Sequence, residues 1–199
     1  MTRSQWVILF SSMISVGFSA AGCNPVGVGD PCIPEDEYSA TFSGFGVSEA
    51  NVESRSLQCD TRVCIVNHFQ GRVSCPYGQR VDASGNVTSG TPPGVCHIPS
   101  SAQNVTVPVD AQLLNRRAED RVYCSCRCEG ADKTATYCTC PNGYSCLPLI
   151  PDLGLGKEQL AGKYCLKNTE NSDQSSGLTC AASAGNCPSA GISNPNMNP

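Results

Sequence analysis

Apolar residues are concentrated near the start of the chain and are scattered after it. The first long, mostly apolar stretch covers residues 6–18, with Arg3 before it and the small residues 19–22 after it. This stretch is 13 residues long, too short to cross a bilayer core of about 30 Å as a helix. A charged start, a short apolar run and small residues are typical of a secretory signal peptide. The pattern therefore predicts export and removal of residues 1–22.

Later in the chain, short apolar runs predict strands and one helix. Residues 62–66 and 71–75 read as two strands of a hairpin joined by residues 67–70, and residues 77–94 as a turn-rich surface loop. Residues 109–122 predict a helix.

The helix prediction depends on a repeat of four. Leu114, Ala118 and Val122 recur at that interval, and Asp110 is placed to cap the start. We expect Leu114 and Ala118 to pack against the cysteine-rich segment that follows.

Composition indicates a chain that needs covalent support. It contains 19 Gly, 14 Pro and 15 Cys, whereas aromatic residues make up only 6%. Such a chain buries little apolar surface per residue, so disulfides are expected to supply part of the stability. Disulfides persist outside the cytosol, in agreement with the export signal. The net charge of −4 argues against a nucleic-acid partner, because phosphate binding needs clustered Lys and Arg.

The predicted cleavage region resembles a known signal. Ala20-Ala21-Gly22-Cys23 is similar to the lipobox of bacterial lipoproteins, in which the cysteine sulfur receives a diacylglycerol and the chain is cut before it. The family prefers Leu where Ala20 stands, so cleavage by ordinary signal peptidase after Ala21 is the alternative. The resemblance implies a membrane anchor at Cys23. Asn24, where many inner-membrane lipoproteins have Asp, implies the outer membrane, on its periplasmic or cell-surface face.

The cysteine count supports the lipid anchor. The chain has 15 cysteines, and removing Cys23 leaves fourteen, enough for seven disulfides. Cleavage after Ala21 would instead leave one thiol unpaired. The disulfide candidates are Cys32, Cys59, Cys64, Cys75, Cys96, Cys124, Cys126, Cys128, Cys138, Cys140, Cys146, Cys165, Cys180 and Cys187.

Two cysteine runs are especially dense. Cys124, Cys126 and Cys128 alternate with other residues, so on an extended strand they would share one face and bond to another segment. Residues 138–146 resemble the end of an EGF-like module. The last spacing of that module is not kept and its calcium-binding residues are not recognisable, so the resemblance implies disulfides only. The matching residues are Cys138, Cys140, Gly143, Tyr144 and Cys146.

The sequence lacks the motifs of metal, redox, haem and hydrolase sites. The sequence has no Cys-x2-Cys pair of the kind used by zinc or thioredoxin-like redox sites, and Cys96-His97 lacks the earlier cysteine needed for haem attachment. His68 and His97 are the two histidines, and no Gly-x-Ser-x-Gly is present. Residues 34–37 are acidic without the spacing of a calcium loop, so a solvated loop is expected. We predict no catalytic residue, metal or cofactor.

These observations together predict a small, disulfide-rich, mostly β fold with loops and one short helix. The predicted units are a signal peptide at 1–22, the lipidated cysteine and a tether at 23–31, a first cysteine-bearing segment at 32–108, the helix and a dense cysteine-rich subdomain at 109–169, and a Ser/Asn/Gly-rich tail at 170–199.

The chain as a whole, with a lipobox-like signal before a cysteine-rich segment, resembles the cysteine-rich surface lipoproteins that myxobacteria and related bacteria encode in large numbers. The resemblance implies a non-catalytic, lipid-anchored envelope protein, with roles such as cell contact or gliding motility. Its partners would be the membrane and another envelope or surface protein or a polysaccharide. The alternative is an accessory hydrolase or a redox or metal-binding envelope factor, which the missing motifs disfavour.

Overall fold

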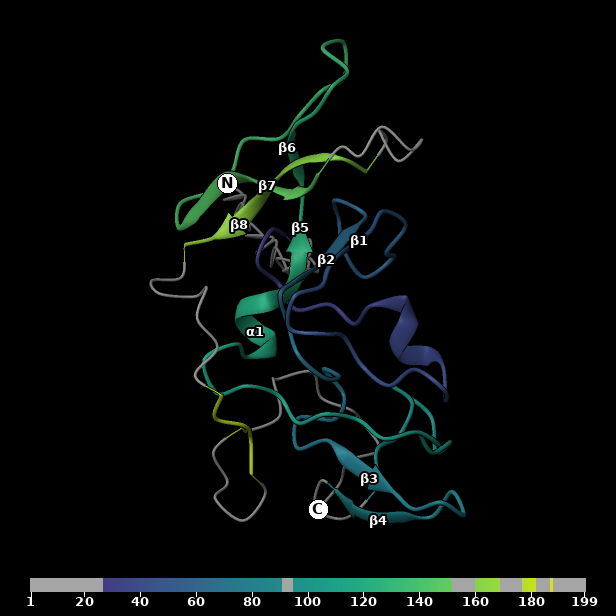
Figure 1. The fold of residues 1–199 in the computed structure, drawn as a ribbon. Helices are drawn as coiled ribbons and strands as arrows, with labels where there is room; N and C mark the ends of the chain where they lie inside the picture. The colour runs from purple at the N-terminus through teal and green to yellow at the C-terminus, as the bar shows by residue number, and fades with distance from the viewer. Residues whose placement is uncertain (1–26, 91–94, 152–159, 169–176, 182–186, 188–199) are drawn as a thin grey trace, which may run out of the picture.

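Short strands joined by long loops make up the described part of the chain (Figure 1). The computed structural model describes residues 27–90, 95–151, 160–168, 177–181 and 187. The predicted signal peptide, Cys23 and most of the tail lie outside them. The elements are η1 (Glu35–Tyr38), β1 (Ala50–Glu53), β2 (Val63–Asn67), β3 (Gln79–Val81), β4 (Val87–Gly90), α1 (Ala118–Arg121), β5 (Val122–Ser125), β6 (Arg127–Glu129), β7 (Tyr144–Ile150) and β8 (Gly162–Lys167).

The fold is therefore mostly β, disulfide-rich and equipped with one short α-helix, as the sequence predicts. A search of the described residues finds no helix with the length and apolar character needed to span a membrane.

The central sheet has the order β1-β2-β5, and all its pairs are antiparallel. Its middle strand, β2, is buried on both faces. Side chains alternate along a strand, so neighbouring residues of β2 enter different clusters. Ile65 points into one apolar cluster, and Cys64 and Val66 point into another. This explains why β2 reads as a continuous apolar run rather than an alternating one.

A second sheet, β6-β8-β7, covers one face of the central sheet. The contact is made by six buried side chains, and each contributes about 1.5–3 kcal/mol by leaving water. They are Val52, Ile65 and Tyr123 from the central sheet and Leu149, Tyr164 and Leu166 from the second sheet. The Tyr123 hydroxyl accepts a hydrogen bond from the backbone N–H of Lys167 at 2.8 Å. Burial raises the pKa of Tyr123 to about 12, so it stays neutral.

The hairpin β3-β4 lies at the opposite end of the molecule from the second sheet (Figure 1). It replaces the surface loop expected over residues 77–94. Buried Gln79 holds this end together: its side-chain amide donates to the carbonyls of Val105 and Val107 at 2.9 and 2.7 Å, and its oxygen accepts the N–H of Cys96 at 3.0 Å. Every polar atom of the buried side chain thus has a partner, as burial requires.

The predicted hairpin between residues 62–66 and 71–75 is wrong in its second strand. The first strand is present as β2, but it pairs with β1 and β5. Residues 71–75 form turns instead, with Gly71 bridged to Phe45. The reason is Glu37: its buried carboxylate accepts the N–H groups of Val73 and Ser74, which a strand would need for its partner.

The predicted helix over residues 109–122 is reduced to α1. The segment before it is bonded as extended chain: Val109 bridges Gln79, Leu113 bridges Thr179, and the N–H of Cys180 donates to the carbonyl of Gln112. Those bonds occupy groups that an α-helix would use internally.

The packing predicted for that helix is met by Ala118 but not by Leu114. Ala118 joins the buried cluster on the face of the central sheet that the second sheet does not cover, together with Phe45, Phe69 and Cys124, the first residue of the cysteine-rich segment. Leu114 is not among the buried residues of that cluster.

Seven disulfides join the fourteen described cysteines. The pairs are Cys32–Cys64, Cys59–Cys124, Cys75–Cys96, Cys126–Cys138, Cys128–Cys146, Cys140–Cys165 and Cys180–Cys187. Cys124, Cys126 and Cys128 each bond to another segment and not to one another. The predicted division at residue 109 is crossed by Cys59–Cys124, which ties the first segment to β5.

The predicted tether over residues 23–31 is partly built into the fold. The N–H of Gly29 donates to the carbonyl of Cys124, and the N–H of Cys124 donates to the carbonyl of Asp30, both at 2.8 Å. Pro31 forms a β-bridge with Tyr123. Residues 29–31 therefore run along β5 and are not a free linker.

Candidate functional site

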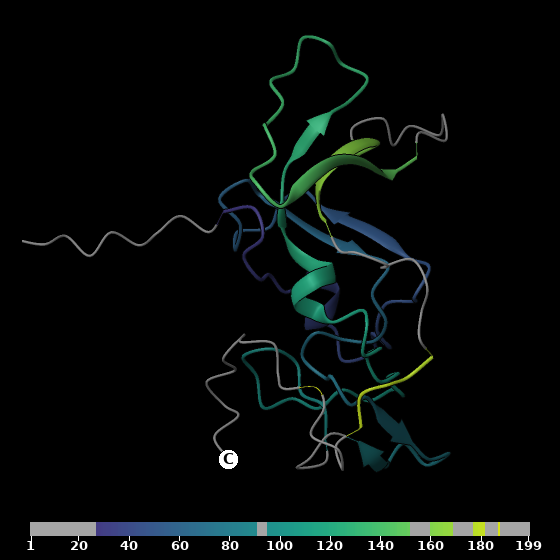
Figure 2. The same cartoon turned by 90° about the vertical axis from the view of Figure 1, so that its left-hand side faces the viewer.

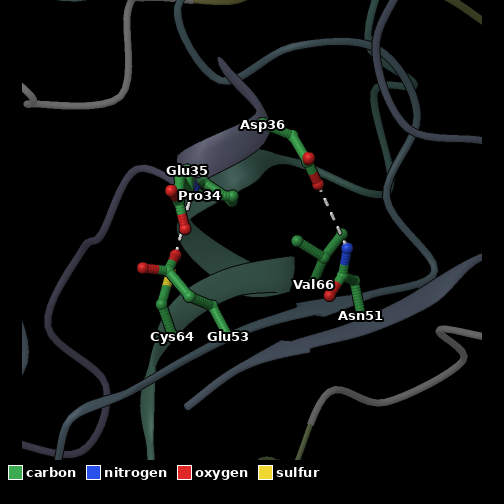
Figure 3. A pocket seen from close by; sticks show the side chains of 7 residues that line it. All are labelled: Pro34, Glu35, Asp36, Asn51, Glu53, Cys64 and Val66. Carbon is green, nitrogen blue, oxygen red and sulfur yellow. Dashed lines mark hydrogen bonds between the residues drawn. The ribbon is translucent and has the colours of Figure 1, made fainter. Parts of the chain in front are cut away.

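An acidic pocket opens between η1 and the strands β1 and β2 (Figure 3). Its volume is about 160 Å³. The lining residues are Pro34, Glu35, Asp36, Asn51, Glu53, Cys64 and Val66. We call these seven residues the acidic pocket.

Local backbone geometry places its polar side chains. Pro34, at φ −58°, leads directly into η1, so Glu35 and Asp36 stand side by side in the first turn. Asn51 and Glu53 are two apart on β1, and alternate residues of a strand share a face. The two elements therefore present their polar groups to each other across the opening.

Two hydrogen bonds fix this arrangement. The backbone N–H of Glu35 donates to Oε2 of Glu53 at 3.1 Å. The side-chain amide of Asn51 donates to Oδ2 of Asp36 at 3.3 Å. Figure 3 shows both bonds spanning from η1 to β1. The remaining carboxylate oxygens are available to accept hydrogen bonds from a ligand.

Burial and like charge act together on Glu53. Partial burial raises the pKa of this carboxyl, and the negative charges of Glu35 and Asp36 raise it further, against the hydrogen bond from Glu35. A cationic or hydrogen-bond-donating ligand would relieve this repulsion. The pocket therefore favours groups such as sugar hydroxyls, ammonium or guanidinium.

The chemistry of the lining is that of recognition. Among the residues that line the acidic pocket there is no histidine, serine or free thiol, since the Cys64 sulfur is bonded to Cys32. Val66 and the disulfide supply an apolar floor. At about 160 Å³ the pocket is smaller than the roughly 300–1,000 Å³ typical of small-molecule sites, so it suits one side chain or one sugar unit.

The two histidines lie elsewhere. His68 is in a turn after β2 with positive φ of 53°, and its ring Nδ1 lies 3.0 Å from the side-chain oxygen of Asn67. The carbonyl of His68 accepts a hydrogen bond from Arg116 at 2.9 Å. His97 forms a β-bridge with Asn104. Neither histidine lines the acidic pocket.

Half of this site is visible in the sequence. Residues 34–37 form an acidic run for which a solvated loop is expected, but these residues enter η1 and Glu37 is fully buried. Asn51 and Glu53 were not predicted. The available signal was their i, i+2 spacing, which predicts a shared face only once that segment is known to be a strand.

Three groups of cysteine sulfurs lie close enough to suggest metal ligands, each within 4.8 Å. The Sγ atom of Cys165 lies 3.6 Å from that of Cys126 and 3.7 Å from that of Cys138. Each of these sulfurs is already bonded in a disulfide, whereas metals bind the thiolate. The spacing reflects stacked disulfides. The three groups are Cys32, Cys59 and Cys124; Cys126, Cys138 and Cys165; and Cys128, Cys140 and Cys165.

Comparison of the chain with protein-family models, with curated proteins and with solved structures finds no match.

Proposed function

We propose that the protein is a non-catalytic, lipid-anchored component of the bacterial cell envelope that binds a polar partner through the acidic pocket. The observation that carries the binding role is the pocket itself: carboxylates from η1 and β1 converge on a small opening whose lining residues include no histidine, serine or free thiol. The disulfides hold these elements in place, so the site is preorganised. The partner is a polysaccharide or another surface protein that offers hydroxyl or cationic groups.

The membrane role depends on Cys23. Each acyl CH₂ buried in a bilayer contributes about 0.8 kcal/mol, and stable attachment needs two or more chains. A diacylglycerol on the sulfur supplies two chains at once. Attachment to the outer membrane would place the acidic pocket at the periplasmic or cell surface, where polysaccharides and neighbouring proteins are found.

Replacing Cys23 with serine is expected to abolish membrane attachment, because the serine hydroxyl does not receive the diacylglycerol. The measurement is incorporation of a labelled fatty acid, together with partition between membrane and soluble fractions. Cys180→Ser is the matched control, since it removes a cysteine without removing the anchor. Wild-type protein that takes up no label would show that the anchor is absent.

A second candidate function is glycoside hydrolysis, and one observation favours it. Many glycosidases pair a carboxylic acid of raised pKa with a second carboxylate. Glu53 has a raised pKa beside Asp36 and Glu35. The pocket therefore has the components of such a pair, although it also fits simple recognition.

Glu53→Gln separates the two functions. We expect wild-type protein to retain bound envelope polysaccharide unchanged, and the variant to bind it about tenfold more weakly, because the amide no longer offers a second acceptor oxygen. The measurements are calorimetric binding and release of reducing sugar ends, with Glu129→Gln on the second sheet as the control. Release of reducing ends by wild-type protein and its loss in Glu53→Gln would establish the hydrolase instead.

A further inference from the structure

The start of the described chain is held very close to the proposed anchor. Only residues 24–26 separate Cys23 from Gly27, and the four Cα–Cα steps between them span at most about 14 Å when the chain is fully extended. The N–H of Gly27 donates to the carboxylate of Asp30 at 2.5 Å, and residues 29–31 are bonded to β5. Whatever surrounds this end of the domain must therefore lie near the anchored membrane surface.

The loop of residues 54–62, between β1 and β2, surrounds that end. The disulfide between Cys59 and Cys124 places their Cα atoms 5.4 Å apart. The side chain of Gln58 accepts the N–H of Ile33 at 3.0 Å and donates to its carbonyl at 2.7 Å. Figure 2 shows this blue loop beside the purple start of the described chain, at the same side of the molecule.

Leu57 stands out on this loop. Its exposed fraction is 83%, higher than that of the other exposed large apolar residues of the described chain, Tyr38, Leu147 and Leu178. The loop is fastened on both sides of Leu57. Before it, buried Ser56 donates its N–H to the carbonyl of Arg62 at 3.1 Å, and after it Gln58 and buried Cys59 are bonded to Ile33 and Cys124. The bonded loop therefore holds the Leu57 side chain in a fixed, solvent-exposed position.

The charges of the loop also suit a lipid interface. Arg55 and Arg62 are exposed on either side of Leu57, and Asp60 is exposed between them. Long cationic side chains can lay their apolar stems along acyl chains while the heads reach the phosphates. Glu53 adjoins the loop, so the group has no net excess of positive charge, and no preference for anionic lipid is expected.

We propose that the loop of residues 54–62 rests on the bilayer to which Cys23 is anchored, with Leu57 inserted among the lipid acyl chains. This inference rests on the proposed anchor. The occupant is lipid because the short link of residues 24–26 keeps this loop at the membrane, and because a single apolar tip is far smaller than the roughly 800 Å² per partner of a stable protein interface. The contact would fix the orientation of the domain, so that its acidic pocket has one defined direction relative to the membrane.

A tryptophan substitution tests the contact directly. The only tryptophan of the chain is Trp6, which lies in the predicted signal peptide, so the mature protein offers no background. Lipidated Leu57→Trp protein is placed in phosphatidylcholine vesicles whose acyl chains carry bromine, which quenches tryptophan within the bilayer. We expect its fluorescence to be quenched several-fold more than that of Leu178→Trp. Leu178 is also exposed, at 62%, and belongs to the yellow segment of residues 177–181, which lies at the other end of the molecule in Figures 1 and 2.

The outcomes separate the contact from the anchor. Protein that floats with the vesicles but shows equal quenching at positions 57 and 178 overturns the loop contact and leaves the anchor standing. Protein that does not float overturns the anchor, and the loop contact with it. Alkylation under non-reducing conditions should find no free thiol in either variant, which establishes that both are folded and comparable.

Discussion

Replacing Glu37 with alanine is expected to destabilise the protein by about 3–5 kcal/mol, because it leaves a buried charge without its partner. The side chains of Glu37 and Arg72 are both fully buried, and Nε of Arg72 lies 3.9 Å from Oε2 of Glu37. The carboxylate also accepts the N–H groups of Val73 and Ser74. Its loss therefore orphans a guanidinium and two backbone donors at once.

Arg72 completes the network from the other side. It donates to the carbonyls of Ser39 and Phe42 at 3.2 and 2.8 Å and to that of Glu37, and its guanidinium carbon lies 5.5 Å from the centre of the Phe42 ring. This one side chain closes the loop after η1. The pair therefore fixes η1 and, through it, the Glu35 and Asp36 wall of the acidic pocket.

Urea unfolding of Glu37→Ala, Arg72→Met and the double variant measures the coupling. We expect the double variant to lose less stability than the sum of the single variants, since removing both charges leaves neither one unpaired. Glu35→Ala is the control: it removes an exposed carboxylate from the same turn and should change stability by less than about 0.5 kcal/mol. Equal effects of Glu35→Ala and Glu37→Ala would refute the buried-pair interpretation.

The pH dependence has a defined sign. Burial raises the pKa of Glu37 above its ordinary 4.5, against the effects of Ser74, Arg72 and Val73. The folded state then binds more protons than the unfolded state, so this contribution to stability is complete below pH 4.5 and is lost as the pH rises through the raised value. Unfolding measured across that range should show a decline in wild-type protein that Glu37→Gln lacks.

The fold class follows from the sequence because it depends on composition. A chain rich in Cys, Gly and Pro and poor in aromatics cannot rely on one large core, so many short strands held by disulfides are the expected solution. The β2 strand was also predictable, since β-branched residues surround Cys64. These are local or additive properties, and a single sequence carries them.

The two wrong secondary-structure predictions concern segments that hydrogen-bond to distant parts of the chain. The repeat of Leu114, Ala118 and Val122 favours a helix, but β-bridges to Gln79 and Thr179 take up the backbone before α1. Residues 71–75 favour a strand, but buried Glu37 takes their N–H groups. Nothing in either local pattern encodes a partner 30 or more residues away. Tertiary hydrogen bonding outweighed local propensity in both places.

The acidic pocket was missed for a similar reason. Glu35 and Asp36 are visible as an acidic run, but their partners Asn51 and Glu53 come from a strand that the sequence did not reveal. The pocket forms only because η1 is fastened by Glu37 and the disulfide between Cys32 and Cys64 crosses from its start to β2. Site and scaffold are therefore linked: the residues that fold η1 are also the residues that shape the opening.

The disulfides are expected to contribute unequally to the free energy of unfolding. The largest difference is expected between Cys59–Cys124 and Cys180–Cys187. The first closes a separation of 65 residues and the second a separation of seven. The chain-entropy relation assigns them about 4.3 and 2.5 kcal/mol respectively. Packing widens this gap, because Cys59 and Cys124 are buried in the largest apolar cluster, where they join the first segment to β5.

The Cys180–Cys187 disulfide lies in the Ser/Asn/Gly-rich tail, but its segment is bonded to the rest of the fold. The fold should nevertheless remain stable when this disulfide is removed. Cys180 and Cys187 are buried, but residues 178–180 are also held by backbone hydrogen bonds to residues 112–114. Those bonds persist without the disulfide. Since the described segment 177–181 contributes no strand to either three-stranded sheet, its local opening need not unfold the central sheet.

Replacing both cysteines of a pair by alanine tests this ranking, and alanine avoids leaving a buried hydroxyl. We expect Cys59→Ala with Cys124→Ala to lower the free energy of unfolding by about 4 kcal/mol or more, or to prevent folding. Cys180→Ala with Cys187→Ala should lower it by about 2 kcal/mol or less, because backbone bonds still hold the segment. Urea unfolding and protease resistance of the two double variants give the comparison. Equal losses of stability would mean that the tail is as much a part of the folded core as β5. The disulfides would then contribute evenly to stability, and Cys59–Cys124, which joins the first cysteine-bearing segment to β5, would have no special role.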